Sequence, residues 1–295
     1  MFDQAQKLRE LAALKDEPVK RARVLAVTSG KGGVGKTNLS VGLALTACAQ
    51  GQRTVILDGD LGLANVDVIL DVQSRYNLSH VLSGEASIED ALTSGPGGVQ
   101  VLPGATGLTR MANLSTPEHQ MLLRSLEGLE QCAELMIVDT GAGISRRVIE
   151  FCLASDEVLV VTTPEPTAIA DAYAMIKVLR QAESAIRLNL IVNMATTPTE
   201  ARQVADKIIN VSRRHLNLEV NFAGYVLSDP RVPHAVRRRT PFSLAYPGTQ
   251  AAAGVRDIAR VLGLDSRAAV RGSGFFRRMS SLFRQRLGLQ VGEGA

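Results

Sequence analysis

The stretch RVLAVTSGKGGVGKTN, residues 23–38, decides the fold. It opens with an apolar run, Arg23 to Thr28, which predicts a buried strand, and it continues into a glycine-rich turn. Gly30 to Thr37 matches the pattern G-x-x-x-x-G-K-[ST], and a helix is expected from about residue 36 to residue 50. The glycines let backbone N–H groups curl around phosphate oxygens, and the helix adds its positive N-terminal end. The stretch therefore predicts a phosphate-binding loop between a strand and a helix.

The residues of this loop have separate expected roles. Lys36 is expected to reach the β- and γ-phosphates of a nucleotide, and Thr37 is expected to ligate Mg²⁺. Further nucleotide contacts are expected from Gly30, Lys31, Gly32, Gly33, Val34, Gly35 and Asn38. The sequence thus predicts ATP and Mg²⁺ as cofactors.

The rest of the chain alternates short apolar runs with helical patterns. The apolar runs occupy residues 53–57, 135–138, 157–162, 188–192 and 223–227. The helical patterns lie near residues 117–131, 145–154, 166–183 and 198–215. Strands that alternate with helices predict an α/β fold with a doubly wound, mostly parallel sheet and helices on both faces. The composition agrees, because 45% of the residues are hydrophobic but only 4% are aromatic, as in the aliphatic core of a parallel sheet.

Two of the expected strands end in carboxylates. Val55 to Leu57 runs into Asp58-Gly59-Asp60, and Leu135 to Val138 runs into Asp139. Ligands bind beyond the carboxyl ends of parallel strands, so these carboxylates are expected beside the phosphate loop. An apolar strand that ends in an acid is the Walker B pattern, and Asp139 is therefore predicted to support Mg²⁺.

The sequence KGGVGKT, residues 31–37, resembles the deviant Walker A signature of the MinD/ParA family, and the resemblance covers roughly residues 22–264. It implies slow, regulatory ATP hydrolysis to ADP and phosphate. It also implies that Lys31 reaches the nucleotide of a second subunit, so that two subunits sandwich two ATP molecules. By the same resemblance, Asp60 orients the attacking water and Asp58 helps to hold Mg²⁺ through water. The catalytic set is then Lys31, Lys36, Asp60 and Asp139, and the metal set is Thr37, Asp58 and Asp139.

Three further segments match the same family. Thr140-Gly141-Ala142-Gly143 resembles its switch II, where glycines permit movement when the γ-phosphate is lost. Asn193, at the end of an expected strand, matches the position that usually reads adenine. Asp229-Pro230 resembles the loop that covers the base.

The bulk properties bound the class of protein. The net charge of +4 is too small to indicate bulk nucleic-acid binding. Cys48, Cys132 and Cys152 have neither metal-knuckle nor redox-pair spacing, and we expect thiols in a reducing cytosol. The N-terminus lacks an apolar signal region, and no stretch approaches the roughly 20 apolar residues of a membrane span. We therefore expect a cytoplasmic protein that meets a membrane only at its surface.

The C-terminal segment, residues 275–289, has the pattern of an amphipathic helix. Its apolar face would contain Phe275, Phe276, Met279, Leu282, Phe283 and Leu287, and its other sides carry Arg277, Arg278, Arg284 and Arg286. Such a helix can lie in the interface of an anionic membrane. A dimer presents two of these helices, so ATP would control membrane residence through the linkage of two weak sites. The alternative is a helix that packs back on the protein, and both interpretations hold if the helix is docked in the monomer.

The N-terminus favours one branch of the family. Residues 2–15 have helical apolar spacing, and Asp3 to Arg9 matches DQAxxLR, which looks like the leading motif of the FlhG (FleN) branch. That resemblance implies a regulator of flagellar number and placement whose N-terminus stimulates FlhF, a GTPase of the signal-recognition type. It also implies flagellar switch (C-ring) proteins and a flagellar transcription regulator as partners.

Two other functions stay open. A division-site ATPase of the MinD type would leave residues 3–9 without a role. A DNA-partitioning ATPase of the ParA type would bind DNA with strong salt dependence, and its candidate basic runs are Arg213-Arg214 and Arg237 to Arg239. Nucleic acid is nevertheless not the expected partner. The iron–sulfur reductase branch is disfavoured because paired cysteines are missing.

Four segments follow from these assignments. Residues 1–20 form an N-terminal amphipathic helix that binds a partner, and residues 21–264 form the ATPase domain. Residues 265–274 are a linker, and residues 275–289 form the membrane-targeting helix.

Overall fold

A computed structural model gives the fold of the 295-residue chain. The structure describes residues 21–60, 65–103, 126–131, 133–183, 185–265 and 274–286. The expected partner-binding helix over residues 1–20, most of the expected linker and residues 287–289 of the tail lie outside these residues.

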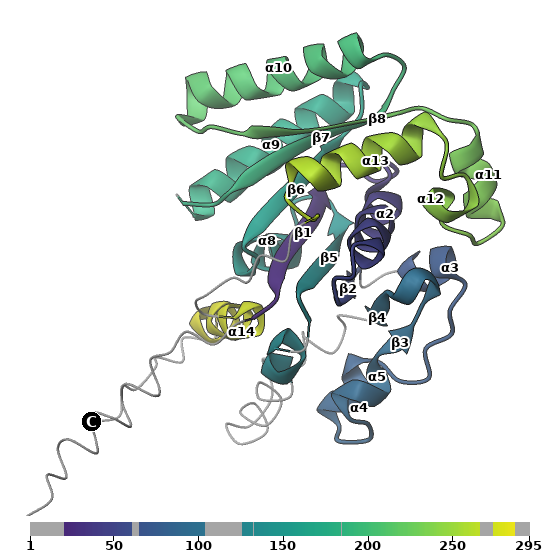
Figure 1. Ribbon diagram of the computed structural model, residues 1–295. Helices are drawn as coiled ribbons and strands as arrows, with labels where there is room; N and C mark the ends of the chain where they lie inside the picture. Colours follow the sequence, from purple (N-terminus) through teal and green to yellow (C-terminus); the bar gives the residue numbers. More distant parts are fainter. Residues whose placement is uncertain are drawn as a thin grey trace, which may run out of the picture.

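Eight strands form one sheet (Figure 1). They are β1 Arg23–Ser29, β2 Thr54–Gly59, β3 Thr93–Ser94, β4 Gln100–Leu102, β5 Leu135–Ala142, β6 Glu157–Thr162, β7 Leu188–Ala195 and β8 Asn221–Leu227. Their order is β3-β4-β2-β5-β1-β6-β7-β8, and every neighbouring pair is parallel except β3 with β4. The prediction of a mostly parallel, doubly wound sheet is confirmed.

Helices of very different length connect the strands. They are α2 Lys36–Ala49, α3 Asn65–Leu70, α4 Leu78–Leu82, α5 Ile88–Ala91, the 3-10 helix η1 Pro96–Gly98, α8 Arg146–Ala154, α9 Pro166–Ala182, α10 Pro198–Leu216, α11 Arg231–Arg237, α12 Phe242–Ala245, α13 Gln250–Val261 and α14 Phe275–Arg286. Residues 126–131 are also helical.

The helices cover both faces of the sheet, because alternate residues of each strand point to opposite sides. In β1, Val24 and Ala26 join the core beneath α8, α9, α10 and α14. Leu25 and Val27 join the core beneath α2, α3 and α13. Both faces of the central strands are thus buried, which explains why these strands are apolar runs in the sequence.

The tail helix α14 lies beside α8, at the end of the sheet where strands β1 and β6 begin (Figure 1). The phosphate loop follows the other end of β1. Nucleotide loop and tail helix therefore occupy opposite ends of the sheet. The apolar face of α14 faces the protein, since Phe275, Phe276 and Met279 are buried in the core.

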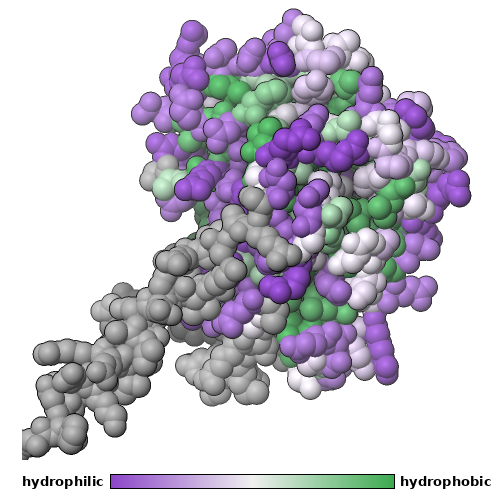
Figure 2. Space-filling view, in the orientation of Figure 1, coloured by the Kyte–Doolittle hydropathy of each residue, from purple (hydrophilic) through white to green (hydrophobic). Residues whose placement is uncertain are grey.

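The surface carries no broad apolar face in the view of Figure 2, where hydrophobic residues form small groups among hydrophilic ones. Among the residues that the structure describes, no helix is both long enough and apolar enough to cross a bilayer.

Candidate nucleotide site

The phosphate loop has the backbone that its glycines predict. Gly33 and Gly35 adopt φ values of 81° and 87°, in the left-handed region that favours glycine. A β-carbon at Gly30 would overlap the backbone carbonyl of Asp171, so glycine is required there for close approach of α9. The loop leads directly into α2, whose N-terminal N–H groups suit phosphate binding.

Lys36 and Asp139 meet beneath this loop. The Lys36 ammonium donates to Ser29 Oγ at 3.0 Å, and burial lowers its pKa although Asp139 and Asp60 oppose the shift. Ser40 Oγ donates to Asp139 Oδ1 at 2.8 Å, one helical turn after Lys36. Burial raises the pKa of Asp139 to about 6, against hydrogen bonds from Thr37 and Ser40 and the charge of Lys36.

Asp58 lies in the neighbouring strand, in register with Asp139. It is fully buried and accepts backbone N–H bonds from Asp60 at 3.0 Å and Val66 at 3.4 Å. Burial raises its pKa to about 7, and the negative charge of Asp139 adds to the shift. Two adjacent buried carboxylates with raised pKa values form a site that a divalent cation would stabilise.

The oxygen set of Thr37, Asp58 and Asp139 fits Mg²⁺. Magnesium is usually held by one or two carboxylates together with substrate phosphates and water. No cluster of three or more His, Cys, Asp or Glu side chains that could hold a metal occurs within the described ranges. The residues therefore fit a magnesium ion that arrives with a nucleotide, rather than a metal cage built by the protein alone.

Asp60 stands at the end of β2, facing the switch segment. Its Oδ2 accepts from Asn65 Nδ2 at 3.4 Å, and a β-carbon at Gly141 would lie 3.7 Å from its Oδ1. The switch loop is tied to β1, because the Gly143 N–H donates to Ser29 O at 2.9 Å. The carboxylate thus sits beside a segment that is bonded to the end of β1, directly before the phosphate loop.

Asn193, Asp229 and Pro230 lie at one side of the loop, where the base of a nucleotide would fit. A pocket there is lined by Gly35, Asn38, Asn193, Met194, Asp229 and Phe242. The Asn193 amide donates to Val34 O at 2.8 Å, which fixes the side chain against the phosphate loop. Asp229 is paired with Arg231 at 2.8 Å, and Pro230 is the N-cap residue of α11. The structure thus brings two of the three candidate base contacts, Asn193 and Asp229, to one pocket, whereas Pro230 does not line it.

Lys31 points elsewhere. Its ammonium lies 2.6 Å from a Glu165 carboxylate oxygen and 3.0 Å from Thr167 Oγ1, at the start of α9. Glu165 was not among the predicted site residues. Ser40 was also missed, and its spacing of four residues from Lys36 is the signal that places it on the same helix face.

Comparison with known proteins agrees with this geometry. Residues 22–192 match the family described as an AAA domain. The antiactivator FleN of Pseudomonas aeruginosa is 40% identical over 238 residues, covering 81% of this chain and 85% of FleN. The chain belongs to the FlhG/FleN branch of the MinD/ParA ATPases. It is therefore an ATPase, as its loop and strand-end carboxylates predict.

One further relative supports this membership, and one solved structure shares the fold. The flagellum site-determining protein YlxH of Helicobacter pylori is 35% identical, covering 81% of this chain and 83% of YlxH. The septum site-determining protein MinD of Pyrococcus horikoshii, solved in complex with Mg-ADP, has the same fold. Its TM-score is 0.64 at 24% identity, and the match covers 84% of this chain and 100% of that one. Flagellar and division-site ATPases thus share one fold with this chain.

Proposed function

We propose that this ATPase is a dimerising switch that regulates flagellar number and placement by moving on and off the membrane. In this proposal Lys36, Thr37, Asp58 and Asp139 hold Mg-ATP, and Asp60 orients the water that ends the ATP state. The pocket at Asn193 receives the base. Lys31 leaves Glu165 when a second subunit supplies its nucleotide.

The observation that carries the proposal is the docked position of α14 on the protein. The helix is amphipathic and cationic, as membrane-surface helices are, yet Phe275 and Phe276 are fully buried against the protein. Insertion into lipid requires the same side chains. Docked and lipid-bound states therefore exclude each other, and any event that weakens the docking of α14 favours the membrane.

Phe151 of α8 contacts both the docked tail helix and the strand that leads to the nucleotide site. Its ring is parallel to that of Phe275, with 6.3 Å between centroids. The same ring packs against β2, because a β-carbon at Gly59 would lie 3.4 Å from Phe151 Cε2. Gly59 stands between Asp58 and Asp60, and α8 begins directly after the switch loop. A shift of residues 58–60 on ATP binding would move Phe151, and with it the ring against which Phe275 packs.

The surface beside the nucleotide site supports a dimer. Ile144, in the switch loop, is 52% exposed, and Val68 of α3 is 48% exposed. Single exposed apolar residues are ordinary, but each of these two follows a strand that carries a predicted site carboxylate, β2 for Val68 and β5 for Ile144. In a face-to-face dimer they would be covered together with the nucleotides.

The first test is co-sedimentation of the intact chain with anionic vesicles, in ATP and in ADP. We expect ATP to bring the intact protein down with the vesicles and a chain truncated at Gly274 to stay in solution. Glu130→Gln removes the charge of the carboxylate on which α14 begins, and we expect this variant to bind vesicles in ADP as well. A DNA pull-down runs in parallel. DNA binding with ATP, without lipid binding, would replace the flagellar proposal by the DNA-partitioning function.

The partner of the N-terminal arm, residues 1–20, needs a separate test. In this proposal the arm stimulates an FlhF-type GTPase through Asp3 to Arg9. Deletion of residues 1–20 should leave the intrinsic ATPase rate unchanged and abolish the stimulation. Undiminished stimulation by the shortened chain would reject the role of the arm.

A further inference from the structure

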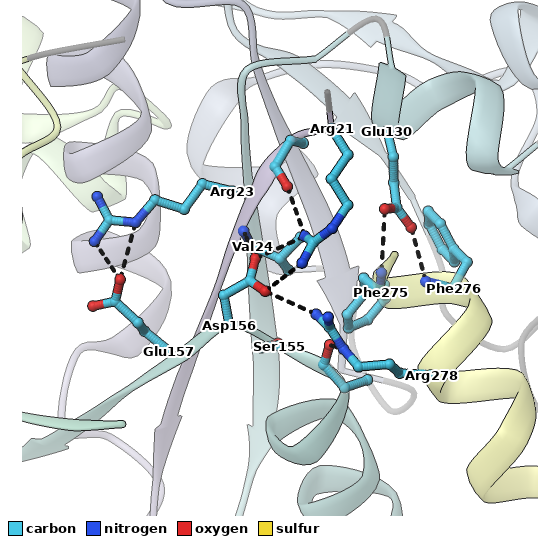
Figure 3. A network of polar contacts seen from close by, with 12 residues as sticks. Arg21, Arg23, Val24, Glu130, Ser155, Asp156, Glu157, Phe275, Phe276 and Arg278 are labelled. Atoms are coloured by element: carbon cyan, nitrogen blue, oxygen red, sulfur yellow. Dashed lines mark hydrogen bonds and ion pairs between the residues drawn. The ribbon is translucent and has the colours of Figure 1, made fainter. Parts of the chain in front are cut away.

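Asp156, just before β6, holds both ends of the fold (Figure 3). Its Oδ1 accepts from Arg21 at 2.8 Å and from Arg278 of α14 at 3.0 Å. Its Oδ2 accepts from Arg21 at 2.9 Å and from the Val24 N–H at 2.8 Å. Arg21 is the first described residue after the N-terminal arm, so one carboxylate anchors the root of the arm and the tail helix together.

Glu130 makes a second link between the same two segments. Its carboxylate accepts the backbone N–H groups of Phe275 at 3.2 Å and Phe276 at 2.8 Å, where α14 begins and where negative charge suits the helix dipole. Its main-chain carbonyl accepts the Ala22 N–H at 2.7 Å. The side chain of Glu130 thus binds the tail helix, while its backbone carbonyl binds Ala22, just after the N-terminal arm.

The charges of this cluster balance only when α14 is docked. Arg21 and Arg278 together oppose Asp156 and Glu130, and each of the four is well shielded from solvent: Arg21 is 6% exposed, Asp156 15%, Arg278 24% and Glu130 2%. When α14 undocks, it carries Arg278 away. Of the two cations in this cluster, Arg21 then remains beside Asp156 and Glu130. Withdrawal of Arg21 as well would leave both carboxylates without a cation of this cluster, although Asp156 keeps the Val24 N–H, and removing the counter-ion of a shielded carboxylate is destabilising.

We propose that Arg21 and Arg278 are alternative counter-ions of Asp156, so that the two ends of the chain oppose each other's release. Release of α14 holds Arg21 more firmly on Asp156. Conversely, a partner that draws Arg21 away makes Arg278 the main counter-ion and favours docked α14. The two effects are equal in size, because coupling between two binding events is reciprocal.

The consequence for the cell rests on the proposed function. If the arm binds a partner and the tail binds lipid, then a partner that withdraws Arg21 sends the protein off the membrane. In a membrane-bound protein, in turn, Arg21 stays paired with Asp156, so a partner that must withdraw Arg21 binds the N-terminal arm less well. The ATPase would then engage the membrane and a partner of this kind in turn rather than together.

Hydrogen exchange of the α14 backbone amides in the full chain tests the coupling without any lipid or partner. We expect Arg21→Gln to slow exchange in α14 by roughly 3- to 10-fold, because the electrostatic hold on Arg278 increases. Arg21→Lys keeps one charge but loses the bidentate pair, and we expect a smaller slowing of roughly 2-fold. In an Asp156→Asn background the Arg21→Gln change should have a smaller effect on α14, because only the interactions of Arg21 with Arg278 and Glu130 remain.

Arg23 provides the matched control. Its ion pair with Glu157, at 2.6 Å and with similar burial, lies at the same end of the sheet and does not include α14 (Figure 3). Arg23→Gln should leave α14 exchange unchanged. Unchanged or faster α14 exchange in both Arg21 variants would overturn the proposal. If these variants behave as expected but the intact protein never binds vesicles, the coupling stands and the membrane function fails.

Discussion

Lys31 Nζ lies 2.6 Å from a carboxylate oxygen of Glu165 in the same chain. The lysine that the family resemblance assigns to a second subunit's nucleotide is therefore held in cis by α9. Both side chains are substantially exposed, at 39% for Lys31 and 64% for Glu165, so the pair is weak and easily exchanged for phosphate oxygens. In the monomer Lys31 is thus held by Glu165, and it would leave this contact when a second subunit presents its nucleotide.

Replacing Glu165 tests this interpretation. We expect Glu165→Gln to tighten the ATP-dependent dimer by up to about 5-fold, because an exposed ion pair of at most about 1 kcal/mol no longer competes for Lys31. Light scattering across a protein concentration series measures the dimer. Glu219→Gln is the control, since it breaks an exposed pair with Arg213 at 2.9 Å outside the nucleotide site. Lys31→Ala should abolish the dimer, and an unchanged dimer in that variant would refute the trans contact.

Asp60 is expected to separate hydrolysis from binding. Asp60→Ala should still bind ATP and dimerise but release phosphate at least roughly 100-fold more slowly, the usual cost of losing a group that positions or activates water. Phosphate release and light scattering on the same sample measure the two properties. Asp71→Asn, an exposed carboxylate 3.7 Å from Arg239, should behave like the parent protein. Loss of ATP binding in Asp60→Ala would show that its role is structural.

The central strands could be predicted because they are long apolar runs. β1, β2 and β5 are buried on both faces, and their ends carry the loop and the carboxylates that the family motif names. Between β2 and β5 the sequence predicted only the helix near residues 117–131, of which residues 126–131 are helical in the structure. There β3 has two residues and α5 has four, and such short elements have no measurable periodicity. Helices α11 to α13 were missed as well, two of them for the same reason.

The site was predictable only along single segments. The loop follows β1, Asp58 and Asp139 lie toward the carboxyl ends of β2 and β5, and the parallel sheet places these strand ends together without further information. The Lys31–Glu165 contact joins residues 134 positions apart, and Asp156 meets Arg278 across 122 positions. No local pattern encodes such pairs. The same limit applies to α14, whose amphipathic pattern is equally suited to lipid and to the core.

Asp58 predicts a pH dependence for the nucleotide-free protein. Its folded-state pKa of about 7 lies above the usual value near 4, so folding favours the protonated carboxyl. This contribution to stability is complete below pH 4 and is lost as the pH rises through about 7. Asp58→Asn removes the titration. We therefore expect the melting temperature of Asp58→Asn, relative to the parent protein, to rise between pH 5 and pH 8.

The same group should affect Mg-nucleotide binding. Only the ionised carboxylate supports Mg²⁺, so affinity for Mg-ADP should increase with pH and level off above about 7. Calorimetry at several pH values measures this. Asp257→Asn changes an exposed carboxylate paired with Arg260 and should leave both pH profiles unchanged. A melting difference that does not vary with pH would mean that Asp58 is ionised throughout.

Gly274 allows the tail to dock. A β-carbon at this position would overlap the Glu130 carboxylate, which receives the first N–H groups of α14. In Gly274→Ala the carboxylate must move away and give up these bonds, and alanine is also a poorer N-cap residue than glycine for α14. We therefore expect faster hydrogen exchange in α14 and vesicle binding in ADP as well as in ATP. Gly128→Ala is the matched control, because it lies on the helix of Glu130 and its β-carbon would meet open space. Equal protection of α14 in the two variants would mean that the cap of Glu130 does not hold the tail, and that its other contacts do so, among them the stacked rings of Phe151 and Phe275 and the Arg278–Asp156 pair.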